Sequence, residues 1–115
     1  NSMGRVRVPV GVAYGTDPRK VETILLEIAE GHPQILRDPG PSVVFMGFGP
    51  DSIDFEIRAF MKDVGYVLAI KSEMNYKITE AFSKAGIEIP FAQRDVSIKN
   101  LESLKAMFNN DEGKI

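Results

Sequence analysis

Apolar and polar residues alternate along several stretches of the chain, which is the period of a half-buried β-strand. Residues 6–12 alternate valines with polar or small residues, and residues 53–61 repeat this pattern at greater length. Residues 43–48 form a mostly apolar run, and residues 96–99 form a last short alternation. Pro9 has no amide donor, so the first strand should lie at a sheet edge or contain a bulge there.

Two other segments place apolar residues at helical spacing. Asp17 can accept hydrogen bonds from free amides as an N-cap, and Pro18 suits the first position of a helix that stops before Pro33. A second helix is expected from about Tyr66 to Ala85, with Gly86 as the residue that ends it. The two apolar stripes contain Val21, Ile24, Leu25 and Ile28 in the first helix, and Ile70, Met74, Ile78, Ala81, Phe82 and Ala85 in the second.

The predicted order is strand, helix, strand, strand, helix, strand, which is the split β-α-β (βαββαβ) plan of an α+β, ferredoxin-like fold. A chain of 115 residues suits one domain, which we place at residues 5–93. Residues 1–4 are polar and look like a cloning remnant. Residues 94–100 contain the last strand, which Pro90 sets apart from the domain body. Residues 101–115 are expected to form a short helix and a flexible tail.

Composition narrows the possible functions. A net charge of −2 and a pI near 5.4 argue against a dedicated nucleic-acid-binding domain. The absence of cysteine excludes disulfides, thiolate metal sites and cysteine nucleophiles. The most apolar stretch, residues 43–49, is far shorter than the ~20 residues of a membrane-spanning helix. We therefore expect the chain as given to be soluble.

His32 is the only histidine of the chain. A catalytic or metal-binding role needs convergent partners, and the sequence offers no second histidine and no cysteine. We interpret His32 as a structural residue that complements the helix dipole near the end of the first helix.

Two further groups of residues invite a chemical interpretation. The glycines of residues 46–50 resemble a phosphate-binding loop, but a strand follows them and the loop contains no lysine, which favours a bulge or hairpin corner. Asp51, Asp54 and Glu56 could form an acid–base pair. Because Asp54 and Glu56 alternate onto one strand face together with Arg58, we interpret them as a solvated, salt-bridged surface.

Phenylalanines are frequent in the central strands, as in RNA-binding sheets that stack bases on aromatic rings. The strand at residues 53–60 is acidic where such a module carries basic residues. Most of these side chains are therefore predicted to lie in the core or in an interface; they are Phe45, Phe48, Phe55 and Phe60. No catalytic constellation is recognisable, and we predict no enzyme activity, no cofactor and no metal site.

Several segments, in order, resemble the C-terminal α/β domain of the small-conductance mechanosensitive channel family, the MscS type. They are Val10 to Tyr14 with Thr16-Asp17-Pro18, His32-Pro33 with Leu36 and Asp38-Pro39, Ser52-Ile53, Ala81-Phe82, and Gly86 to Phe91 with Gln93. The resemblance extends over about residues 5–100. The family tail usually has a proline where this chain has Ala92, which loosens the backbone that leads into the last strand.

The resemblance implies a subunit of a homo-oligomeric channel, normally a heptamer, in the inner (plasma) membrane. In this family α/β domains close a hollow cytoplasmic cage through which ions and small solutes pass, and osmotic stress opens the pore. The membrane helices would lie N-terminal to this chain, so the chain cannot conduct ions by itself. The last strand of each subunit joins a small parallel barrel, and residues 96–98 match its position. The residues expected to shape the tail and build the barrel are Gly86, Pro90, Phe91, Gln93, Val96 and Ile98.

Two alternatives remain open from the sequence. The fold also suits a stand-alone regulatory module that binds a small ligand at a dimer interface. A preceding catalytic domain in the parent gene would favour that module, whereas a preceding run of hydrophobic helices would favour the channel. An RNA-binding sheet is disfavoured by charge and would show salt-dependent binding.

Overall fold

The computed structural model describes residues 3–90, and its elements follow the predicted order. They are β1 (Gly4–Val12), α1 (Pro18–Glu30), β2 (Ser42–Phe48), β3 (Ile53–Met61), the short 3₁₀ helix η1 (Val64–Tyr66) and α2 (Val67–Ala85). The α+β class is confirmed, and these elements match the first five of the six predicted ones. The predicted strand at residues 96–99 and the helix after residue 100 lie outside the described residues.

The three strands form one antiparallel sheet in the order β1-β3-β2. In this register Val8 and Val43 both face Ile57 of the central strand. Pro9 lies opposite Glu56, and the pairing of β1 with β3 runs without a register shift. Within the described part of the chain β1 is an edge strand, as Pro9 predicted. Since Pro9 cannot donate, its backbone must occupy a position that points away from β3.

The β2–β3 connection contains the irregularity that the glycines predicted. The register shifts between Phe45 and Gly47, and Gly47 has a φ of 139° that favours glycine. The amide of Gly49 donates to the carbonyl of Ser52 at 2.7 Å and closes the corner. The glycine-rich segment is thus a bulge followed by a hairpin corner, as expected.

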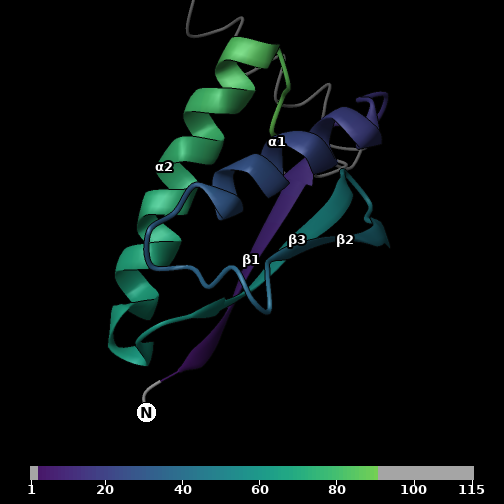
Figure 1. Ribbon diagram of the computed structural model, residues 1–115. Coiled ribbons are helices and arrows are strands. Elements are labelled where there is room, and N and C mark those ends of the chain that lie inside the picture. The colour runs from purple at the N-terminus through teal and green to yellow at the C-terminus, as the bar shows by residue number, and fades with distance from the viewer. Residues whose placement is uncertain (1–2, 91–115) are drawn as a thin grey trace, which may run out of the picture.

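One face of the sheet is buried, and both helices cover it. In Figure 1, α1 crosses in front of the upper part of the strands, and α2 stands at a steep angle to α1 on the left of the view. The helical stripes join the inward residues of the strands in one core because a half-buried sheet alternates its side chains between core and solvent. The fully buried side chains of this core include Val6, Val8, Val12, Val21, Leu25, Ile57, Met61, Ile70, Met74 and Phe82.

The helix starts follow the local chemistry of the chain. The side chain of Asp17 accepts a hydrogen bond from the amide of Arg19 at 3.0 Å, so Asp17 is the predicted N-cap of α1. Helix α2 begins at Val67, because the side chain of Asp63 caps the preceding 3₁₀ turn through the amide of Gly65 at 2.9 Å. The expected start near Tyr66 was therefore one residue early.

No helix among residues 3–90 has the length and apolar character needed to cross a membrane. Over the same residues, no cluster of histidine and acidic side chains is arranged to hold a metal ion.

Candidate assembly site at the end of helix α2

Helix α2 ends at a residue in the left-handed conformation. Gly86 has φ 71° and ψ 25°, and its amide donates to the carbonyl of Ser83 at 3.4 Å. The amide of Ile87 donates to the carbonyl of Phe82 at 2.9 Å. This pattern satisfies the last carbonyls of the helix. A Cβ at Gly86 would meet no atom within 4 Å, so the backbone angle, rather than space, favours glycine here.

The two residues after Gly86 attach the start of the tail to the domain. Ile87 is only 9% exposed and joins the hydrophobic core. The carbonyl of Glu88 accepts a hydrogen bond from the amide of Ala13 at 2.9 Å, directly after β1 ends. On the neighbouring helix α1, Lys20 donates to the carbonyl of Ala85 at 3.4 Å. The chain therefore leaves α2 beside the C-terminal end of β1.

The described chain continues through Ile89 and Pro90 beyond this attachment. Ile89 is 49% exposed, and Pro90 is partly buried as the last described residue. Of the predicted assembly residues, the structure describes Gly86, which ends α2, and Pro90, which follows Ile89. The other predicted assembly residues, Phe91, Gln93, Val96 and Ile98, lie outside the described residues. Their part in assembly stays a prediction.

His32 has a more specific environment than the sequence indicated. Helix α1 ends at Glu30, and His32 is buried after it, only 4% exposed. Its Nδ1 accepts a hydrogen bond from the backbone amide of Gln34 at 3.1 Å. Its Nε2 lies 3.5 Å from Oε2 of Glu73 on α2 but makes no hydrogen bond within residues 3–90.

His32 is a structural residue, as expected. Its hydrogen bond with the Gln34 amide orders the turn after α1.

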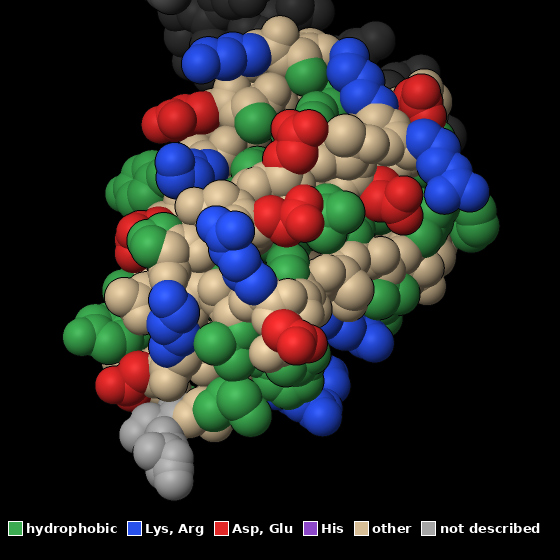
Figure 2. Space-filling view, in the orientation of Figure 1, with side chains coloured by type: hydrophobic (Ala, Val, Ile, Leu, Met, Phe, Trp, Pro, Cys, Tyr) green, Lys and Arg blue, Asp and Glu red, His purple; other side chains and the backbone are tan. Residues whose placement is uncertain are grey.

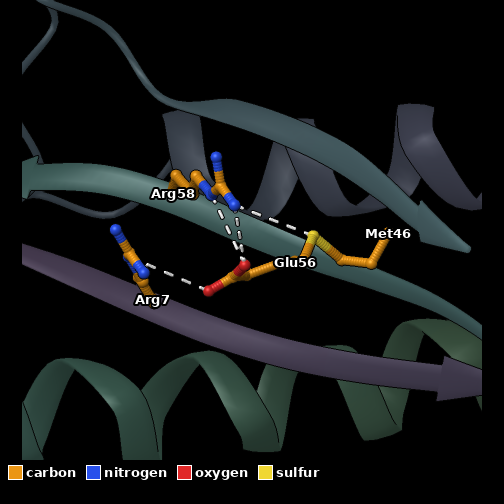
Figure 3. Close-up of polar contacts among 4 residues, drawn as sticks. All are labelled: Arg7, Met46, Glu56 and Arg58. Atoms are coloured by element: carbon orange, nitrogen blue, oxygen red, sulfur yellow. Dashed lines mark hydrogen bonds and ion pairs between the residues drawn. The ribbon is translucent and has the colours of Figure 1, made fainter.

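Two of the three acidic residues in and after the β2–β3 corner, Asp54 and Glu56, make polar contacts. Asp54 accepts from the hydroxyl of Ser52 at 2.6 Å. Figure 3 shows Glu56 between two arginines, with Oε2 3.2 Å from a terminal nitrogen of Arg58 and Oε1 4.0 Å from Nε of Arg7. The interpretation of a salt-bridged strand face fits these contacts.

Sequence reasoning paired Glu56 with Arg58 but missed Arg7. The contact depends on the register between β1 and β3, which a single sequence does not give. The alternation of β1 does indicate that Arg5 and Arg7 lie on the solvent face, opposite the valines, where Glu56 also lies. This pattern could have suggested Arg7 as a partner of Glu56.

The phenylalanines divide between the core and the surface. Phe55 is buried at 2% exposed, and its ring lies 4.7 Å from that of Phe45. Phe45 and Phe48 are 42% and 77% exposed at the β2 edge, with rings 5.5 Å apart. Phe60 lies under the guanidinium of Arg5 at 5.3 Å on the solvent face of the sheet. The core assignment is thus confirmed for Phe55.

The helix-bearing side of the molecule shows no large area of one charge. In the view of Figure 2, acidic and basic side chains are interspersed over this side. Such a surface is typical of a folded domain in water and has no basic stripe of the kind that nucleic-acid binding requires.

A single antiparallel sheet with two helices on one face defines an α+β domain of the ferredoxin-like type. The family model described as "Mechanosensitive ion channel MscS, C-terminal" matches residues 6–89. The chain belongs to the MscS family of mechanosensitive ion channels, and the described fold is that of the family's C-terminal domain. Because this is a family of channels, the expectation of a non-enzyme is confirmed.

Individual relatives agree with this assignment. An uncharacterised MscS family protein of Haemophilus influenzae is 43% identical over 100 residues, which cover 87% of this chain and 9% of that protein. Another, from Archaeoglobus fulgidus, is 36% identical over 110 residues, covering 96% of this chain and 37% of that protein. The crystal structure of Helicobacter pylori MscS in the closed state aligns with a TM-score of 0.75 at 28% identity, covering 87% of this chain and 40% of that one.

The chain thus spans well under half the length of these relatives. The similarity identifies the domain and its family.

Proposed function

We propose that this chain is the cytoplasmic cage domain of a mechanosensitive channel that releases ions and small solutes when hypo-osmotic stress raises membrane tension. The observation that carries the proposal is the match of residues 6–89 to the C-terminal domain of MscS channels. The chain would not conduct ions by itself, because the pore-forming helices would precede it. It would lie on the cytoplasmic side of the inner membrane.

The capped end of α2 supports a role in assembly. The tail leaves the domain from a fixed point, because Gly86 sets its direction and Ile87 and Glu88 attach its first residues to the core and to β1. A strand that follows such an exit presents unpaired backbone groups, and edges of this kind seek partners. Closing several copies around an axis pairs all of these groups at once.

We infer that residues 94–100 form this strand and that copies of it build a small barrel in a homo-heptamer. Pro90, Phe91 and Gln93 would direct the chain into the barrel, and Val96 and Ile98 would pack on one side of the strand. Ions and small solutes would pass the cage formed by the domains.

A charge placed on the predicted barrel strand tests this function. Val96→Asp in the full-length protein should impair assembly, because a carboxylate replaces a side chain that the barrel would bury. The expected result is a loss of heptamer in detergent extracts and a loss of osmotic-shock survival in cells that lack other mechanosensitive channels.

Ser97→Asp is the matched control, since it places the same charge on the other side of the strand. Unchanged heptamer yield and survival for Val96→Asp would show that the barrel assignment is wrong. Failure of the unmodified full-length protein to protect cells from osmotic shock would contradict the channel function itself.

A further inference from the structure

The solvent face of the sheet carries three arginines close together. In the register of β1 and β3, Arg7 lies directly opposite Arg58, and Arg5 lies opposite Phe60 one step along the same face. Ser42 of β2 lies opposite Arg58 on its other side. Like charges placed opposite each other across strands are destabilising, so this arrangement requires negative charge nearby.

The carboxylate of Glu56 supplies only part of the negative charge that would offset the three arginines. Glu56, with its side chain 14% exposed, approaches Arg58 at 3.2 Å and Arg7 at 4.0 Å. The next acidic residue along this face, Asp54, is bound to the hydroxyl of Ser52. Within residues 3–90, Glu56 is thus the one carboxylate that pairs with this group of three arginines, and it approaches only Arg58 and Arg7, so the described surface keeps an excess of positive charge.

The guanidinium groups also keep free donors. Arg5 stacks over the ring of Phe60, and within the described residues Arg7 makes only the 4.0 Å ion pair. Over residues 3–90 neither side chain donates a hydrogen bond to a protein acceptor. A guanidinium holds five N–H donors in a planar fork that matches carboxylate and phosphate oxygens.

A pocket of about 200 Å³ lies among these groups, lined by the three arginines together with Ser42, Gly40 and Phe60. Its volume is smaller than the roughly 300–1,000 Å³ of sites for drug-sized ligands. The pocket therefore suits a small ion rather than a nucleotide or a peptide.

We propose that this pocket binds a small oxyanion with two negative charges, of the size and shape of inorganic phosphate. Arg7 and Arg58 donate charge-assisted hydrogen bonds to it, Arg5 adds a third positive charge, and the anion relieves the repulsion that Glu56 leaves uncompensated. The site lies on the sheet face away from the helices and does not depend on the role of the tail in assembly.

Titration of the 115-residue chain with inorganic phosphate tests the site, at constant ionic strength set with sodium chloride and at about pH 8, where phosphate is a dianion. Backbone amide and arginine Nε resonances in NMR spectra should shift in a saturable way at Arg7, Arg58 and Ser42. Replacing one charged hydrogen-bond donor, as in Arg58→Gln or Arg7→Gln, should weaken phosphate binding about tenfold.

Arg19→Gln is the matched control, because Arg19 is an exposed arginine on α1 that lies away from the sheet face and pairs with Glu22. It should leave the affinity unchanged. Glu56→Gln should strengthen binding, since it removes the carboxylate that competes for the same donors. Shifts that do not saturate, equal weakening by Arg19→Gln, or weakening by Glu56→Gln would each overturn the proposal. Arg7, with its side chain 59% exposed, can be replaced without disturbing the core.

Discussion

Single residues fix the backbone path at the C-terminal ends of both helices. Gly86 does so where the tail follows α2, and His32 does so in the turn after α1. Gly86 allows the left-handed conformation that stops α2, and this role could be predicted because a glycine after an apolar stripe is a common helix signal. The contact of His32 with the amide of Gln34 could not be predicted. It depends on the path of the turn, and neither residue has a pattern that reveals it.

At the residue scale, Gly86→Ala tests the helix stop. An alanine in the left-handed region costs about 1–2 kcal/mol, so the free energy of unfolding, measured with urea, should fall by that amount. Gly86→Asn should lose less, because asparagine tolerates this conformation better.

Ser83→Ala is the control for this measurement, since Ser83 is exposed in the last turn of the same helix. A change within about 0.5 kcal/mol is expected for it. Equal stability of Gly86→Ala and the unmodified chain would contradict the role of Gly86.

At the scale of elements, alternation and helical spacing were enough to place the strands and helices, and β3 has the same bounds as predicted, residues 53–61. The contacts between elements could not be predicted from the sequence. The ion pair of Arg7 with Glu56 depends on strand register, and the hydrogen bond of Ala13 with Glu88 joins segments far apart in the chain. The local sequence around each of these residues does not show which distant residue it contacts in the fold.

The attachment of the tail to β1 can be measured with a pair of isoleucines. Ile87 is buried and Ile89 is 49% exposed, so Ile87→Ala should cost about 2–5 kcal/mol of unfolding free energy. Ile89→Ala should cost less than about 0.5 kcal/mol.

Hydrogen exchange of the Ala13 amide gives a local measure of the same contact. It should be slow in the unmodified chain and in Ile89→Ala, and faster in Ile87→Ala because the tail no longer holds Glu88 in place. If the amide exchanged equally fast in all three proteins, the tail would not be attached at β1.

At the scale of the whole molecule, the resemblance indicated the family from scattered motifs, and the family model confirms it. The composition alone indicated only a small globular domain. The predicted barrel residues at positions 91–98 lie outside the described residues. Their partners would be copies of themselves, which a single chain does not contain.

We expect the isolated 115-residue chain not to form a stable heptamer. The pore helices, which we expect to lie N-terminal to this chain, would supply much of the interface proposed to hold the ring. Sedimentation velocity should show species smaller than a heptamer, whereas the full-length protein in detergent should sediment as one. A stable heptamer of the isolated chain would show that this domain and its tail suffice for assembly.

Pro9 affects whether the free edge of β1 can pair with strands of other molecules before the subunits assemble. Strand β1 has a free edge in the described part of the chain, and a foreign strand that approached this edge would find donors at Arg7 and Gly11 but none between them. A continuous ladder of backbone hydrogen bonds, the basis of fibril growth, is thereby interrupted at its middle. The chain can thus expose a strand edge during synthesis while remaining a poor template for aggregation.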